Sequence, residues 1–134
     1  LQDHAREAWG PFDDDRRAPT KEQIDASIAD VKASVAKIRA RGGEVVFIRP
    51  PSAGPFLERE NRNAPRATTW DRLLEETGTV GVHYEDYAGM RGLEVPEWSH
   101  LSRESAARFT RAYIDALRER NVRLRAGPVV HPPA

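Results

Sequence analysis

The strongest constraint on the fold is an amphipathic helix pattern followed at once by a short apolar run. Residues 20–23 (TKEQ) fit a capping box, and apolar residues then recur at spacings of four and three. These apolar residues are Ile24, Ile28, Val31, Val35 and Ile38. Two glycines at 42–43 suit a left-handed helix end, and residues 44–48 (EVVFI) have the composition of a buried strand. A helix that leads directly into a buried strand is typical of α/β domains with a parallel sheet.

The rest of the chain continues this alternation. The expected elements are, in order, a loop over 49–67, a short helix from Thr69 to near Gly78, a strand over 80–84, a loop over 89–96, a helix from Ser102 to near Asn121 and a strand at 122–124. The last helix carries one apolar stripe, which consists of Ala106, Phe109, Tyr113 and Leu117. We expect His83 to face away from Val82 and Tyr84, because side chains alternate along a strand.

The length of 134 residues suits a single domain or the C-terminal portion of one. We interpret residues 1–18 as an irregular arm and residues 125–134 as a proline-ended tail. The pattern predicts the C-terminal part of an α/β fold, with a partial three-layer parallel sheet and flanking helices. Two strands make a marginal sheet. We therefore expect further strands in a preceding N-terminal segment, consistent with a first residue of Leu1, or in a second copy of the chain.

Composition excludes several classes of function. Lys plus Arg and Asp plus Glu both number 21, so the chain lacks the basic surface that nucleic acid binding requires. There is no cysteine, and the histidines share no metal-ligand spacing, so we predict no metal and no cofactor. No apolar run approaches the roughly 18 residues of a membrane span, and the N-terminus is too polar for a signal peptide.

Residues 96–102 (PEWSHLS) place an acid three positions before a histidine, followed by a leucine and a polar helix cap. This block resembles the last sequence block of the SGNH/GDSL hydrolases, and the preceding helix, strand and loop order is also similar back to Ile24. The resemblance implies a flavodoxin-like sheet, with His100 as the general base and Glu97 as the acid that orients it. It also implies an ester substrate, which is a small molecule or an acylated carbohydrate.

The resemblance is incomplete in two respects. The family ordinarily has aspartate where this chain has Glu97, and the longer side chain changes the hydrogen-bond geometry to the histidine. The Gly-Asp-Ser block with the nucleophile, and the glycine and asparagine that donate to the oxyanion, are not recognisable. The first hypothesis is therefore the C-terminal portion of an ester hydrolase or acyl-transfer enzyme, with its serine in a missing N-terminal segment. The alternatives are a non-catalytic binding or assembly domain that has lost the nucleophile, and a generic α/β domain.

Four further residues are candidates for substrate binding, namely Arg49, Ser52, Asp86 and Trp98. Arg49, Ser52 and Asp86 lie at or just beyond the ends of the two expected strands, where parallel sheets usually bind ligands. Each also has an ordinary structural explanation. Arg49 and Asp86 could be solvated or paired with each other, Ser52 could be a loop serine, and Trp98 could be a packing residue. Glu97 could equally be a carboxylate favoured by the dipole of the last helix.

Overall fold

A computed structural model describes Glu7 and residues 18–124. The expected arm at 1–18 lies almost wholly outside the described residues, and so does the tail at 125–134. The helices and strands are α2 (Lys21–Arg39), β1 (Val46–Arg49), α3 (Gly54–Asn63), α4 (Trp70–Thr77), β2 (Val80–His83) and α5 (Arg103–Glu119). Short 3-10 turns follow at Arg66–Thr68, Tyr84–Asp86 and Ala88–Met90.

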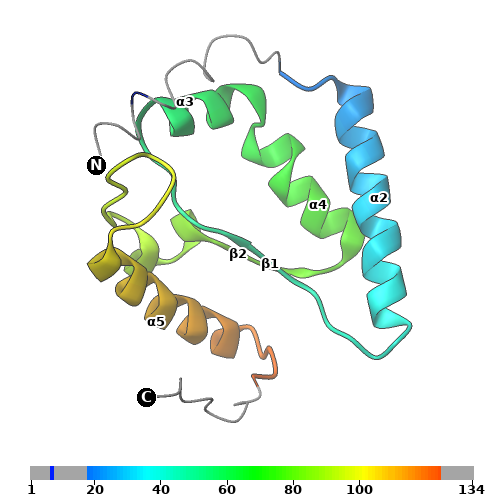
Figure 1. Cartoon of the computed structure of the whole chain (residues 1–134). Helices are drawn as coiled ribbons and strands as arrows, with labels where there is room; N and C mark the ends of the chain where they lie inside the picture. The colour runs from blue at the N-terminus through cyan, green and yellow to red at the C-terminus, as the bar shows by residue number, and fades with distance from the viewer. Residues whose placement is uncertain (1–6, 8–17, 125–134) are drawn as a thin grey trace, which may run out of the picture.

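The two strands form a parallel pair, in which Val46 lies opposite Val80 and Arg49 opposite His83. Helices lie on both sides of the strands, with α4 and α2 to one side and α5 to the other (Figure 1). Gly81 faces α4, because a Cβ atom built on it would collide with Leu74 and Trp70. The neighbouring Val82 faces the opposite side, as strand geometry requires. The predicted α/β class with a parallel sheet and flanking helices is thus confirmed.

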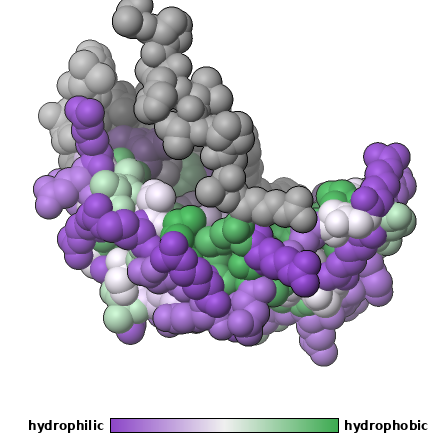
Figure 2. All heavy atoms as spheres, turned by 90° about the horizontal axis from the view of Figure 1, so that it is seen from below, coloured by the Kyte–Doolittle hydropathy of each residue, from purple (hydrophilic) through white to green (hydrophobic). Residues whose placement is uncertain are grey.

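The main core lies between β2 and α5. Its buried members are Val82, Tyr84, Met90, Leu93, Phe109, Ala116 and Leu117. Phe109 and Leu117 belong to the apolar stripe expected on the last helix. On the other side of the sheet, α2 buries Ile28 and Val35 but leaves Ile38 exposed. From below, hydrophobic side chains gather in the middle of the molecule and are bordered by hydrophilic ones (Figure 2).

The predicted helix ends are largely confirmed. The Thr20 hydroxyl accepts a hydrogen bond from the Gln23 backbone N–H, and the Gln23 side chain completes the capping box. Ser102 caps α5 by accepting from the Ser105 N–H. Gly78 ends α4 in the left-handed conformation, with φ of 59°. Thr69 precedes α4 as predicted, but its hydroxyl donates to the carbonyls of residues 64 and 65 and makes no cap.

Two predictions about local structure were wrong. The segment 49–67 contains the ten-residue helix α3, which begins with Gly54 and has a proline in its first turn. Proline is favoured there because a backbone N–H in the first turn has no partner within the helix, so its absence costs nothing, and because the φ of proline already suits a helix. The expected strand at 122–124 is not a strand, because no neighbouring strand lies beside it among the described residues.

The two helices on one side of the sheet are joined at their C-terminal ends by Arg39. Its guanidinium donates to the carbonyl of Thr77 at 2.7 Å and to that of Gly78 at 2.8 Å. These carbonyls end α4, where a cation is favoured by the helix dipole. Arg39 therefore holds the last turn of α2 against the turn that leads into β2.

Candidate acid–base site

The candidate site lies in the loop before α5, and this loop is closed by backbone hydrogen bonds. The Ser102 N–H donates to the Glu94 carbonyl at 3.0 Å, and the Glu94 N–H donates to the buried Ser105 hydroxyl at 2.8 Å. Trp98 has a φ of 72°, which turns the chain sharply and brings the next two side chains back toward Glu97. The loop is thus a defined structure on the N-terminus of α5.

A second contact fixes this loop against the segment after β1. The Ala53 N–H donates to the Trp98 carbonyl at 3.0 Å. The Trp98 ring lies over Gly54, where a Cβ atom would come within 2.8 Å of it. Gly54 also has a positive φ of 52°. The position of the candidate site therefore depends on the absence of a side chain at Gly54.

His100 and Glu97 form the hydrogen-bonded pair that the sequence predicted. His100 Nδ1 lies 2.7 Å from Glu97 Oε1, and the two side chains are 78% and 15% exposed. Ser99 Oγ donates to the other carboxylate oxygen at 2.8 Å and also lies 2.8 Å from His100 Nδ1. Because a carboxylate only accepts and Ser99 donates its one proton to Glu97, the remaining proton belongs on Nδ1. The lone pair of the neutral imidazole is then on Nε2, on an exposed ring.

The carboxylate of Glu97 is held in its charged form. Burial alone would raise the pKa of Glu97, but hydrogen bonds from Ser99 and His100 outweigh it and the pKa lies below its ordinary value. A charged, partly buried carboxylate that accepts from Nδ1 fixes the tautomer and the orientation of the imidazole. Glu97 thus has the properties of an orienting acid, although it carries one methylene more than aspartate.

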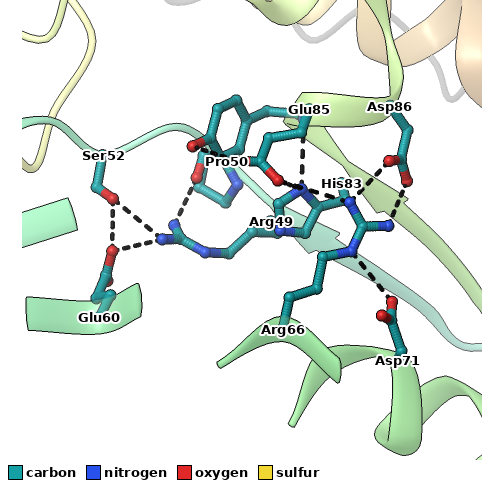
Figure 3. Close-up of polar contacts among 10 residues, drawn as sticks. Arg49, Pro50, Ser52, Glu60, Arg66, Asp71, His83, Glu85 and Asp86 are labelled. Atoms are coloured by element: carbon teal, nitrogen blue, oxygen red, sulfur yellow. Dashed lines mark hydrogen bonds and ion pairs between the residues drawn. The ribbon is translucent and has the colours of Figure 1, made fainter. Parts of the chain in front are cut away.

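A separate polar cluster surrounds the end of β1 (Figure 3). Arg49 donates to Glu60 Oε2 at 2.5 Å, to Ser52 Oγ at 3.0 Å and to the Pro50 carbonyl at 2.6 Å. The Ser52 hydroxyl is buried and donates to the same Glu60 oxygen at 2.5 Å. Ser52 and Arg49 are therefore used in joining β1 to α3.

The cluster around the end of β2 is built on Arg66. Both terminal nitrogens of Arg66 donate to the carboxylate of Asp86, at 2.8 and 2.9 Å, and its Nε donates to Asp71. The hydrogen bonds from Arg66 lower the pKa of Asp86, and the hydrogen bond to Asp86 raises that of Arg66. Arg49 and Asp86 are thus not paired with each other, as one interpretation of the sequence allowed.

His83 lies between these two clusters in Figure 3 and is deeply buried, with a side chain only 8% exposed. Its ring packs edge-on against Trp70, with centroids 5.3 Å apart, and stacks on Tyr84 at 5.1 Å. The expectation that His83 faces away from Val82 fits its contact with α4, but the ring of Tyr84 is its neighbour. Burial lowers the pKa of His83, and the nearby charge of Arg66 lowers it further. His83 is therefore neutral at pH 7.

A cavity of about 870 Å³ adjoins these clusters, between the strand ends and helices α2, α3 and α4. Its volume is within the range of small-molecule sites, about 300–1,000 Å³. Arg49, Glu60, Arg66 and His83 line it, whereas Glu97 and His100 do not. The cavity and the acid–base pair are separate features of the molecule.

The structure thus divides the predicted site residues into three groups. Glu97 and His100 are in contact in the loop that contains Trp98, Arg49 and Ser52 share the cluster at the end of β1, and Asp86 lies with Arg66. Sequence reasoning missed Glu60, Arg66 and His83. Glu60 was hidden by the expectation of a loop at 49–67. His83 was considered only for the side of the strand that it faces, although a polar residue at the end of an expected strand is a signal for a site.

No group of three or more metal-binding side chains occurs within residues 18–124 or at Glu7. In the same part of the chain, no helix combines the length and the apolar character needed to cross a bilayer. No protein-family model, curated protein or solved structure matches the chain.

Proposed function

We propose that this chain supplies the acid–base pair of a serine-type ester hydrolase or acyl-transfer enzyme. The observation that carries the proposal is the 2.7 Å contact between His100 Nδ1 and Glu97 Oε1, which leaves Nε2 free on an exposed ring. That arrangement is the one a histidine base requires when a carboxylate orients it. The resemblance of residues 96–102 to the SGNH/GDSL hydrolases supports the same assignment.

In the proposed reaction, His100 Nε2 accepts the proton of a serine hydroxyl as the serine oxygen attacks the ester carbonyl carbon. The same nitrogen then returns the proton to the departing alcohol oxygen, as the bond between carbonyl carbon and alcohol breaks. Water or an acceptor alcohol then gives its proton to Nε2 and attacks the carbonyl carbon of the acyl-serine. Nε2 returns the proton to the serine oxygen as the acyl group is released. Glu97 stays ionised throughout and stabilises the imidazolium.

The nucleophile is proposed to come from a segment outside the described residues. The Ser52 hydroxyl is committed to Glu60, and Ser99 contacts Nδ1 rather than Nε2. A preceding N-terminal segment would supply the serine, and that segment or a second copy would supply further strands and complete a three-layer sheet. Both outer edges of the pair formed by β1 and β2 are available for this in the described part of the chain.

The test combines intact mass with covalent labelling of the protein from its natural source. We expect a mass above 15.1 kDa, or a co-purifying fragment, together with labelling by a fluorophosphonate, which reacts with activated serines. Replacing His100 with alanine should lower both labelling and hydrolysis of p-nitrophenyl acetate by about 10²- to 10⁴-fold. Glu97→Gln should have a smaller effect in the same direction. Labelling of His100→Ala at the unaltered rate would rule out the proposal.

A non-catalytic binding or assembly domain is the second candidate. It is favoured by one observation, that Nε2 of His100 has no serine partner among the described residues. A protein of 15.1 kDa that is not labelled by fluorophosphonate would support this candidate.

A further inference from the structure

The cavity bordered by α2, α3 and α4 has apolar side chains on its walls and polar side chains at one end. Its walls include Ile24, Ile28, Leu57, Trp70 and Leu73, which come from all three helices. At one end, Arg49, His83 and Glu85 from the carboxyl ends of the strands and the turn after β2 lie near Glu60 and Arg66. Parallel sheets commonly bind ligands at this edge. An occupant of this cavity would therefore have an apolar body and a polar end.

The charged side chains that line the cavity are two of each sign, Arg49 and Arg66 with Glu60 and Glu85. Arg49 is paired with Glu60, and Arg66 is paired with Asp86 and lies near Glu85. An anionic ligand would have to displace one of these carboxylates, and a cationic ligand would face both guanidinium groups. Each would lose ion-pair energy in a partly desolvated site. The charge distribution therefore suits an uncharged ligand.

One polar side chain at this end has hydrogen-bonding capacity to spare. His83 Nδ1 accepts from the Glu85 N–H at 3.3 Å, so the proton of the neutral ring is on Nε2. Nε2 has no protein acceptor among the described residues, although the side chain is more than nine-tenths buried and lines the cavity. Nε2 is not one of the fully buried unpaired atoms, so its N–H is open to the cavity and can donate to a ligand oxygen there.

We propose that this cavity is a binding site for an uncharged molecule with an apolar chain and a carbonyl group. The carbonyl oxygen accepts the Nε2 proton of His83, and the chain lies against Ile24, Leu57 and Leu73. This inference goes beyond the proposed function, because the site does not include His100 or Glu97 and requires no chemical step.

The first test uses the unaltered chain and three probes of equal length, octanamide, octanoate and octylammonium. Isothermal titration calorimetry at pH 7.5 should show octanamide binding about tenfold more tightly than either ion, a difference that one desolvated polar interaction can supply. Equal binding of all three probes, tighter binding of an ion, or no binding of octanamide at millimolar concentration would overturn the proposal.

Two substitutions locate the binding. His83→Phe keeps a ring between Trp70 and Tyr84 and should weaken octanamide about tenfold. Leu57→Glu places a charge on the cavity wall and should abolish binding, whereas the same change at the exposed Leu124 should not alter it. His100→Phe should leave binding unchanged, so failure of this proposal is distinguishable from failure of the acid–base assignment. Circular dichroism establishes that each variant is folded, and undiminished octanamide binding by folded Leu57→Glu would contradict the assigned site.

Discussion

Gly54 is the residue on which the position of the acid–base pair most depends. Its φ is positive, and its missing Cβ leaves room for the Trp98 ring. We expect Gly54→Ala to cost about 1–2 kcal/mol of stability for the left-handed conformation, and to displace Trp98 in addition. The displacement should alter tryptophan fluorescence and the NMR resonances of the His100 ring.

Gly92 provides a matched control for this substitution. It also has a positive φ, of 66°, but a Cβ atom there would meet nothing within 4 Å. Gly92→Ala should therefore show the backbone cost alone, without the change at His100. Equal effects of the two substitutions in urea unfolding would mean that the contact between Gly54 and Trp98 is unimportant.

His83 should make stability depend on pH in a defined window. Its pKa is lowered in the folded protein, so below about pH 6.5 the unfolded chain binds a proton that the folded chain does not. The free energy of unfolding should thus be highest above pH 6.5 and should fall as the pH is lowered through the folded pKa. Urea unfolding between pH 7.5 and 5 measures this slope.

The corresponding variant is His83→Phe. Its free energy of unfolding should depend less on pH across the same window, whatever its absolute stability. The carboxylates with lowered pKa values, such as Asp86 and Glu97, titrate at lower pH and add their own loss there. Parallel curves for the variant and the unaltered chain between pH 7.5 and 5 would show that His83 is not the group responsible.

At the scale of the elements, the N-cap of α5 joins the core to the candidate site. Ser102 accepts from the Ser105 N–H, and its own N–H closes the loop onto Glu94. We expect Ser102→Ala to cost about 1 kcal/mol, the usual effect of losing a cap. Thr110→Ala, at an exposed position of the same helix, should change stability by less than about 0.5 kcal/mol. Thermal unfolding followed by circular dichroism compares them, and equal melting temperatures would contradict the prediction.

Elements that depend on residues close together in the sequence were predictable. Elements that depend on contacts with distant parts of the chain were not. The capping box at Thr20 and the period of α2 depend on residues three or four positions apart, so the sequence displays them directly. Helix α3 was missed because Gly54 and a proline were interpreted as loop residues, although proline also favours a first helical turn. The segment 122–124 has strand composition but no strand to pair with in the described structure.

At the scale of the whole molecule, the candidate site also contains both local contacts, which were predictable, and long-range contacts, which were not. The contact between Glu97 and His100 is local, with a spacing of three, and was predicted, whereas the roles of the two residues stay a prediction. The contacts of Arg66 with Asp86 and of His83 with Trp70 join residues more than ten positions apart. Such contacts follow from the parallel crossover, and sequence patterns of short period carry no information about them. The cavity arises from the same crossover.

The contact of Arg39 with the end of α4 has a consequence for the lengths of the connections. Because it joins the end of α2 to the end of α4, the connections into β1 and β2 start close together. One extra residue before β1 would shift its register by one and turn Val46 away from the core, and one before β2 would do the same to Val82. An insertion after Gly43 should therefore abolish cooperative thermal unfolding, whereas one after the exposed Gly92 should be tolerated. In this chain, the number of residues between helix and strand specifies the core as much as their identity does.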